Sequence, residues 1–463
     1  MIFLNSFLNE LNKRILVFDG SKGYLLQKFG MKGGECPELW NVERKDIVKK
    51  IYSLYKEAGS DVIQTNTFTG NRAHLERHGL EDKVYELNFE GTRLAKEVMG
   101  HDGFVAASIG PTGMLMEPMG DLTFDKAYEL YKEQIQAVVD GGADIINFET
   151  FTDVSEMRAA LLAAKATADL PVICSMSFEA NGRTLMGTDP ETVVLILKSL
   201  GADLIGTNCS FGPELMVDIV RKMHSAGAGF LSVKPNAGLP EIIDGVPVYK
   251  ENPDNFAKLV SEFVNYGGRL IGGCCGTTPE FIRAIRKEID KIYAERMDAG
   301  NIYEMGEIKN KEVLDNIVSS STRSFSINDY KNMKIGYLST KDDLDLLNKL
   351  TAGDLSIVMD KTMDLSEEDY DCIQISIDNA IEIIRNSEKK ESDSCELLAR
   401  VVNEAQGFLK EPIIFETKYP DELERALRIY KGRAGVVLST LPLSAKDTDA
   451  IRNVAKKYGA VII

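Results

Sequence analysis

The chain has 463 residues, of which 44% are hydrophobic and 27% are charged. At roughly 100–200 residues per domain, this length predicts two or three domains, or one large barrel with a smaller partner. Asp and Glu number 71 against 54 Lys and Arg, which gives a formal charge of −17. An acidic chain repels phosphate groups, so we expect neither nucleic-acid nor anionic-membrane binding. No apolar run reaches the ~18 residues that a membrane span needs.

The start of the chain and its cysteines predict a reducing, cytoplasmic setting. The opening segment MIFLNSFLNELNKR lacks a basic region and is interrupted by polar residues, so it is a poor secretory signal. There are seven cysteines, an odd number, and two of them are adjacent. This pattern does not fit a secreted disulfide framework. We expect free thiols, used as ligands or buried as small hydrophobic groups.

Eight short apolar runs, rich in β-branched residues, recur over the first three hundred residues. Each ends in small or polar residues, and their spacing of about 37 residues is close to that of a βαβ unit. Runs that are apolar almost throughout suit a parallel sheet buried on both faces. The expected strands are Ile15–Gly20, Asp61–Phe68, Phe104–Pro111, Ala143–Phe151, Pro171–Phe178, Ala202–Ser210, Phe230–Gly238 and Gly267–Gly276.

Amphipathic segments separate these runs. Apolar residues recur with a helical period over Asp121–Gly141, Val154–Ala168 and Glu214–Ala226. Asp153 and Asp189 are suitable helix caps. Eight strands that alternate with helices predict an α/β fold, the (β/α)8 TIM barrel. The alternative is a doubly wound open sheet, but no G-x-G-x-x-G motif follows the first strand.

Polar residues and cysteines gather where the expected strands end. In such barrels the catalytic groups lie at the carboxyl ends of the strands. One or two polar residues there would be explained as caps or turn residues, whereas their presence after nearly every strand indicates a site. The residues in question are Asp19, Asn66, Ser108, Glu149, Ser177, Cys209, Asn236, Cys274 and Cys275.

Three of these residues form a candidate metal site. Cys209 ends the sixth expected strand, and Cys274 with Cys275 ends the eighth, so only one strand separates them in a closed barrel. Thiolates bind soft or borderline ions, with zinc the first choice. Three protein ligands leave one coordination position open, as in catalytic zinc sites. The alternative is three buried core cysteines; that is also our interpretation of Cys174, which lies within the fifth strand.

The order of several motifs resembles a known family. GTNCSFGP, KPNAGLP and GGCCGTTP, preceded by FDG, TNTF, ASIGPTG and FET, are similar to the homocysteine S-methyltransferase family, which includes the N-terminal module of cobalamin-dependent methionine synthase. The resemblance implies zinc on the three cysteines, with the homocysteine sulfur as the incoming ligand. It also implies that Ser108 and Asn236 line the substrate pocket. After Gly20, at the expected substrate edge, the chain has Ser21-Lys22-Gly23-Tyr24 where the family has small residues.

The amino group of such a substrate needs a carboxylate partner. Glu149, at the end of the fourth expected strand, is the first candidate, and Asp19 is the second. Glu149 could instead be an acid placed favourably before the helix that follows Asp153.

The last third of the chain predicts a second α/β domain. We expect the barrel over 1–296, a polar linker over 297–333 and the second domain over 334–463. The expected strands are Lys334–Leu338, Asp354–Met359, Asp371–Ser376, Pro412–Thr417, Ala434–Ser439 and Ala460–Ile463, and the expected helices are Ser394–Leu409, Glu422–Lys431 and Lys446–Tyr458.

The segments EPIIFETKYPDELERALRIYKGRAGVVLST and AKKYGAVII resemble the middle of a pterin-binding barrel. The remaining ~165 residues are fewer than the ~250 of a complete barrel. The polar stretch that contacts folate in that family has no match here, and Glu416 stands where the family carries an aspartate. We therefore expect a structural or docking role for this domain rather than folate binding.

These observations predict an enzyme that transfers a methyl group to the thiolate of homocysteine and forms methionine. The donor stays open. A partner protein carrying methylcobalamin fits the pterin-like domain, sulfonium compounds such as S-methylmethionine or S-adenosylmethionine fit a freestanding module, and betaine is a further option. Two alternatives are a zinc scaffold without turnover, with Cys174 as a fourth ligand, and a docking subunit with an inactive barrel.

Overall fold

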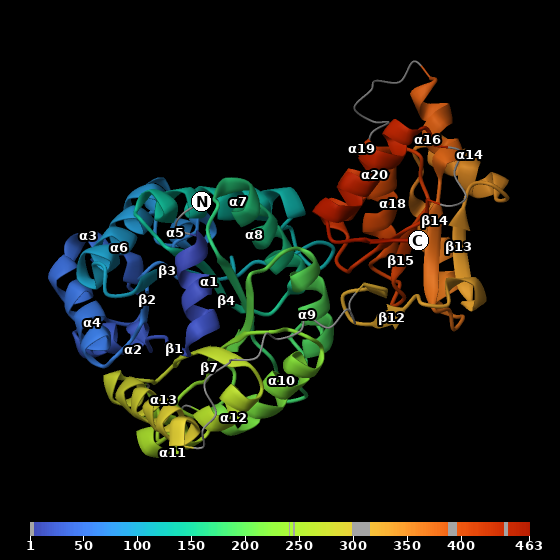
Figure 1. Ribbon diagram of the computed structural model, residues 1–463. Coiled ribbons are helices and arrows are strands. Elements are labelled where there is room, and N and C mark those ends of the chain that lie inside the picture. Colours follow the sequence, from blue (N-terminus) through green and yellow to red (C-terminus); the bar gives the residue numbers. More distant parts are fainter. Residues whose placement is uncertain (1–3, 240, 244–245, 299–314, 388–395, 439–442) are drawn as a thin grey trace. The chain divides into compact units, whose positions relative to one another are not determined.

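The structure is a computed structural model that describes residues 4–239, 241–243, 246–298, 315–387, 396–438 and 443–463 (Figure 1). Its contacts divide the chain into two compact units. The first comprises Met1–Met186 and Ala202–Lys311, and the second comprises Gly187–Gly201 and Glu312–Ile463. Among the described residues, no helix is both long enough and apolar enough to cross a bilayer.

Eight parallel strands of the first part of the chain form one barrel sheet. The strands are β1 (Leu16–Val17), β2 (Val62–Gln64), β3 (Phe104–Ile109), β4 (Ile145–Phe151), β5 (Val172–Met176), β6 (Leu204–Asn208), β7 (Leu231–Lys234) and β10 (Gly268–Ile271). Their order is β1-β10-β7-β6-β5-β4-β3-β2. A parallel bridge between Phe18 and Val62 joins β1 to β2. The prediction of a TIM barrel is therefore confirmed, and the doubly wound alternative is wrong because the strands follow one another in chain order.

Helices alternate with these strands and surround them (Figure 1). They are α2 (Lys22–Lys28), α3 (Trp40–Glu43), α4 (Lys45–Glu57), α5 (Arg72–Glu76), α6 (Val84–Met99), α7 (Phe124–Asp140), α8 (Val154–Thr167), α10 (Pro213–Ser225), α11 (Pro253–Lys258), α12 (Val260–Asn265) and α13 (Pro279–Asp298). Helix α9 (Pro190–Ser199) lies between β5 and β6 in the chain and is grouped with the second unit. The predicted caps are confirmed, because Asp153 accepts from the backbone N–H of Ser155 and Asp189 from that of Thr192. Such caps satisfy backbone donors that have no partner within the helix.

The amino-terminal end of the barrel is closed by an apolar core. Helix α1 (Leu4–Lys13) places Phe7 and Leu11 against the first residues of several strands, including Leu16 and Val62. The side chains of Phe7 and Leu11 are almost fully buried. Because this end is filled with hydrophobic groups, the polar residues of the strands are left for the opposite, carboxyl-terminal end.

The second unit contains a five-stranded parallel sheet. Its strands are β13 (Ile335–Ser339), β14 (Cys372–Ser376), β15 (Ile413–Phe415), β16 (Gly435–Val436) and β17 (Val461–Ile462), and they neighbour one another in chain order. The helices are α14 (Leu344–Ala352), α15 (Ser356–Ser366), α16 (Asp378–Arg385), α18 (Leu397–Ala405), α19 (Pro420–Ile429) and α20 (Ala445–Lys457). The three predicted helices of this region therefore correspond to α18, α19 and α20. Residues 394–395, which begin the first predicted helix, and Ser439, which ends a predicted strand, lie outside the described residues. The relation to pterin-binding barrels stays a prediction.

One predicted strand of the second unit is wrong. Asp354–Met359 is not a strand, because α15 begins within it at Ser356, and Asp354 accepts hydrogen bonds from the backbone N–H and the hydroxyl of Ser356. Ile357, Val358 and Thr362 are buried on this helix. A short apolar run cannot be assigned to strand or helix by its period alone, and here the amphipathic pattern continues beyond the run.

Of the expected linker 297–333, residues 297–298 end helix α13 of the barrel, whereas residues 315–333 pack with the second unit. Residues 299–314 lie outside the described residues, whereas β11 (Ile317–Ser319) and β12 (Ser324–Ser326) form an antiparallel hairpin. Val318 of this hairpin joins a core cluster with Cys372, Ile414 and Val437. The hairpin thus covers apolar residues of the second sheet.

We predict that the α1 helix stabilises the barrel unit strongly. Phe7→Ala should lower its free energy of unfolding by about 3–5 kcal/mol, because a buried ring leaves a cavity. Asn12→Ala, on an exposed position of the same helix, is the matched control and should change it by less than about 0.5 kcal/mol. Trp40 is the single tryptophan of the chain and is buried in the barrel unit, so its fluorescence during urea unfolding reports on that unit. Equal stability of the two variants would contradict this role.

Candidate thiol and metal site at the carboxyl end of the barrel

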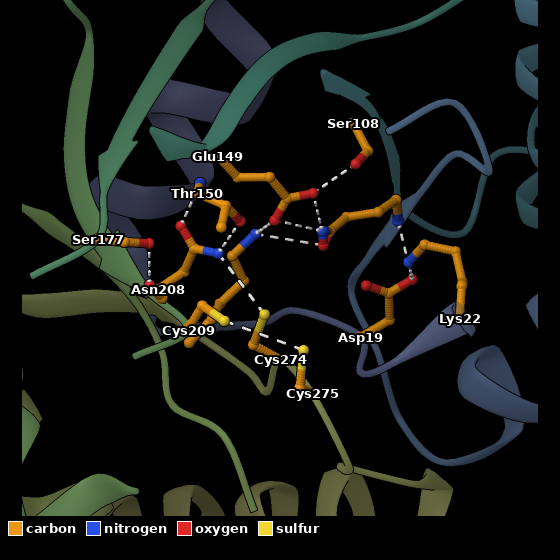
Figure 2. A network of polar contacts seen from close by, with 12 residues as sticks. Asp19, Lys22, Ser108, Glu149, Thr150, Ser177, Asn208, Cys209, Cys274 and Cys275 are labelled. Carbon is orange, nitrogen blue, oxygen red and sulfur yellow. Dashed lines mark hydrogen bonds and ion pairs between the residues drawn. The ribbon is translucent and has the colours of Figure 1, made fainter. Parts of the chain in front are cut away.

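A cavity of about 320 Å³ lies at the carboxyl ends of the barrel strands. It is lined by several residues that the sequence singled out, namely Gly20, Ser108, Glu149, Cys209, Cys274 and Cys275, and also by Lys22, Gln64, Asn66 and Thr150. Asp19 and Asn236 are not part of this lining but contact residues that are. Figure 2 shows the side chains of Ser108, Glu149, Cys209, Cys274 and Cys275 converging from separate strands, with Asp19 and Lys22 beside them.

The structure brings the three cysteine sulfurs together. Cys209 follows β6, and Cys274 and Cys275 follow β10. The sulfurs of Cys209 and Cys275 are 3.9 Å apart, and all three lie within 4.8 Å of one another. Among the described residues, this is the one group of three or more His, Cys, Asp or Glu side chains that could hold a metal ion. Their role as ligands stays a prediction, which the proposed function takes up.

Unusual backbone conformations position these sulfurs. Thr150, Cys209 and Ser210 have φ angles of 66°, 64° and 63° and are the non-glycine residues with positive φ in the described chain. Such conformations cost about 1–3 kcal/mol each and persist only where surrounding contacts enforce them. All three of these residues lie at the site, so the strain is concentrated where the sulfurs are presented.

Asn208, which precedes Cys209, connects Thr150 to Cys274. Its side-chain oxygen accepts from the backbone N–H of Thr150 at 2.8 Å, and its amide nitrogen donates to the Thr150 hydroxyl at 2.8 Å and to the Cys274 sulfur at 3.6 Å. Asn236 acts similarly on the other side, where its side-chain oxygen accepts from the backbone N–H of Cys275 at 3.1 Å. These two amides orient the backbone that carries the thiols.

Gly276 allows the adjacent Cys274 and Cys275 to approach the cavity. Its φ of 78° lies in the left-handed region, and a Cβ atom there would lie 2.2 Å from the ring of Tyr249. Any other residue at this position would displace either the ring or the Cys274–Cys275 turn.

The three thiols titrate together. Hydrogen bonds from Cys274, and then from Cys275, lower the pKa of Cys209, while the same hydrogen bonds raise the pKa values of Cys274 and Cys275 above the usual thiol value.

A buried ion pair that the sequence did not predict lies beside the sulfurs. Lys234, the last residue of β7, is fully buried and donates to both Glu149 and Gln64. Glu149 also accepts from Ser108 and from the Gln64 amide at 2.9 Å. Glu149 is thus already neutralised by a lysine before any substrate ammonium is present. A basic residue at the end of the apolar run FLSVK was the available signal, because an interior lysine needs an anionic partner.

Asp19 pairs with a second lysine. Its carboxylate is fully buried and accepts from the Lys22 ammonium and from the backbone N–H of Gln64 through the same oxygen. Burial raises the pKa of Asp19, although the charge of Lys22 opposes this effect.

Other predicted residues have structural contacts. Ser177 donates to the backbone oxygen of Asn208, and Asn66 donates to Pro37 O and to the side chain of Asn41. Cys174 is fully buried within β5, and this burial raises the pKa of its thiol. It is not one of the three clustered cysteines.

The fold and this site define a TIM barrel with a thiol cluster at its carboxyl end. Residues 16–289, more than half of the chain, match the homocysteine S-methyltransferase family, and the chain belongs to that family.

Two curated relatives are similar over the same region. The methionine synthases of Mycobacterium leprae and Mycobacterium tuberculosis are 33% and 32% identical over 298 and 305 residues. These matches cover 60% and 62% of this chain but only 24% and 25% of the relatives. The chain thus spans about a quarter of the length of the relatives that it matches.

Solved structures show a similar barrel. The oxidized and metallated forms of the homocysteine methyltransferase MmuM from Escherichia coli are 23% and 22% identical, each with a TM-score of 0.51. Each match covers 62% of this chain and 99% of the other. At this level of identity the likeness shows the fold.

We predict that replacing only one partner of the Lys234–Glu149 ion pair destabilises the barrel. Lys234→Met should lower the free energy of unfolding of the barrel by about 3–5 kcal/mol, because Glu149 would be left buried without its cation. Lys234→Met/Glu149→Gln should recover most of this loss. Lys132→Met, in an exposed ion pair, is the control and should cost less than about 1 kcal/mol. The measurement is urea unfolding followed by Trp40 fluorescence, and a double variant no more stable than the single one would contradict the prediction.

Proposed function

We propose that the barrel is a zinc-dependent homocysteine S-methyltransferase, which moves a methyl group to the thiolate of homocysteine and forms methionine. The observation that carries this proposal is the cluster of Cys209, Cys274 and Cys275 in the lining of a cavity of substrate size. Membership in the homocysteine S-methyltransferase family supports the choice of acceptor.

The donor set fits zinc. Zn–S bonds of about 2.3 Å at tetrahedral angles place sulfur atoms about 3.8 Å apart, and the sulfurs of Cys209 and Cys275 lie at 3.9 Å. Among the described residues the cluster has three members, so a fourth position would face the cavity. Three protein ligands with one open position are typical of catalytic zinc rather than structural zinc.

When bound, zinc would deprotonate an incoming thiol, which otherwise has a pKa of about 8.5 and is mostly protonated at neutral pH. The contributions of the chain itself are geometric and electrostatic. The left-handed backbone of Cys209 and the amides of Asn208 and Asn236 keep the sulfurs aimed at one point. The S–CH3 bond would form as the bond between the methyl carbon and the donor breaks, with the electron pair of that bond remaining on the donor. The sulfur of the thioether product would carry no charge, so the product would bind the site more weakly than the thiolate.

The amino acid part of the substrate would occupy the polar side of the cavity. Glu149 and Ser108 line it, and Gly20 forms its edge. Because Glu149 is shared with Lys234, we propose that it accepts the substrate ammonium only through the lone pairs that its present partners leave. Asp19 and Asn236 would contribute by holding the neighbouring residues in place.

We propose that the methyl donor is a methylated corrinoid on a partner protein. The segments of the second unit that resemble a pterin-binding barrel support this donor. The second candidate is a small sulfonium donor, which would suit a barrel that works without a corrinoid partner. A cytoplasmic setting is part of the proposal, because the six described cysteines are free thiols.

The zinc ligands can be tested without a methyl donor. Cys209→Ser should lower the zinc content of the purified chain by more than half, and should weaken zinc binding at least 100-fold in competition with a chelator, because a thiolate ligand is lost. Cys174→Ser, which removes a buried thiol outside the cluster, should retain one zinc per chain. Loss of zinc from the Cys174 variant would instead favour a closed four-cysteine scaffold. Full zinc content in the Cys209 variant would contradict the ligand set.

The donor class can be tested by product formation. Zinc-loaded chain and homocysteine are mixed with a methylated corrinoid, S-methylmethionine, S-adenosylmethionine or betaine in parallel, and methionine is measured by mass spectrometry. We expect methionine with the corrinoid and at least 100-fold less with the other donors. Removal of zinc by a chelator should abolish formation, and added zinc should restore it. Methionine formation only with a sulfonium donor would contradict the corrinoid proposal but not the acceptor.

A further inference from the structure

Lys22 is a cation in an unexpected place in the cavity. It is the first residue of α2 and lies where the family has small residues, yet only 11% of its side chain is exposed. It lines the same cavity as Glu149 and the three cysteines. Among the described residues that form this lining, Lys22 is the one with a cationic side chain.

The other nearby lysine cannot serve the same purpose. Lys234 is fully buried, is not part of the cavity lining, and is committed to Glu149 and Gln64. A bound ligand would therefore meet the ammonium of Lys22 and not that of Lys234.

The ammonium of Lys22 is held firmly but is not saturated. It donates to Asp19 at 2.8 Å, and Asp19 is itself fixed by the backbone N–H of Gln64 at 2.9 Å (Figure 2). An ammonium group has three N–H donors. Among the described residues, Asp19 is the one hydrogen-bond partner of the Lys22 ammonium, so two of its N–H donors can reach a ligand.

The cavity therefore offers one cationic side chain within the same space as its thiols and the carboxylates of Glu38 and Glu149. An amino acid that bears a thiol carries a carboxylate, an ammonium and a sulfur, and each has a counterpart here in Lys22, Glu149 and the cysteine cluster. A thiol without a carboxylate would leave Lys22 facing an empty part of the cavity.

Resting on the function proposed above, we infer that Lys22 binds the α-carboxylate of the thiol substrate and makes the site select thiols that carry a carboxylate. Asp19 is the positioning residue for Lys22, because it fixes the ammonium at the edge of the cavity. A charge-assisted hydrogen bond of this kind changes affinity by about 10- to 100-fold.

The experiment uses the full chain loaded with Co²⁺ in place of zinc, because thiolate binding to cobalt changes its visible absorption. Three probes are titrated at constant pH and ionic strength: L-homocysteine, L-homocysteinamide, which lacks the negative charge, and 3-aminopropane-1-thiol, which lacks the carboxyl group. The wild-type chain should bind homocysteine about 10- to 100-fold more tightly than either analogue. Absence of this preference overturns the inference, and this comparison does not depend on any variant.

The variants then assign the preference to one residue. Lys22→Met should remove the preference by weakening homocysteine binding, and should leave the affinity for both analogues within about threefold. Lys28→Met, on the last turn of the same helix, is the matched control and should keep the wild-type preference. A Lys22→Met chain that still prefers homocysteine overturns the inference while leaving the proposed function intact. A wild-type spectrum that none of the thiols changes overturns both.

Discussion

The site depends on the closure of eight parallel strands into one barrel. Closure places the carboxyl ends of β6 and β10 at the same end of the sheet, with β7 alone between them. Cys209 and Cys275 are 66 residues apart in the chain, yet their sulfurs are separated by 3.9 Å. An open sheet in another strand order would not bring them together. The backbone strain at Cys209 and Ser210 is then tolerated because the strands and the two asparagine side chains hold the loop from both sides.

The charges around the cavity are arranged as two ion pairs with different environments. Lys234 is fully buried behind the cavity lining and pairs with Glu149, which is part of that lining, and a lone charge there would be costly. Lys22 and Asp19 lie at the edge, where the lysine remains accessible to a ligand. Since both pairs are neutral, the polar side of the cavity suits a ligand with one positive and one negative charge. Under the proposed function, a metal ion bound by the three cysteines would balance the charge of their thiolates.

Much of the barrel could be predicted from the sequence because its signals are local and repeated. Eight apolar runs of similar spacing, capped helices and polar residues after each strand agree with one another. The clustering of Cys209 with Cys274 and Cys275 follows from strand order once the barrel is assumed. The prediction of a strand over Asp354–Met359 is wrong, because a run of six residues with four apolar side chains does not distinguish a strand from a short stretch of helix.

Other features depend on packing and could not be predicted from local pattern. The left-handed conformations of Thr150, Cys209 and Ser210 are enforced by neighbouring strands, and none of these residues is a glycine that would have signalled them. The pairing of Lys234 with Glu149 joins residues 85 positions apart, so it becomes visible only when β4 and β7 face the same interior.

The central claim is that three sulfurs of this chain hold zinc and leave one position for the sulfur of the substrate. X-ray absorption at the zinc edge measures the number and the distance of the atoms bound to the metal. The account predicts three sulfurs at about 2.3 Å with one lighter atom in the protein alone, and four sulfurs after addition of homocysteine. Four sulfurs before the addition, or a spectrum that homocysteine leaves unchanged, would contradict it.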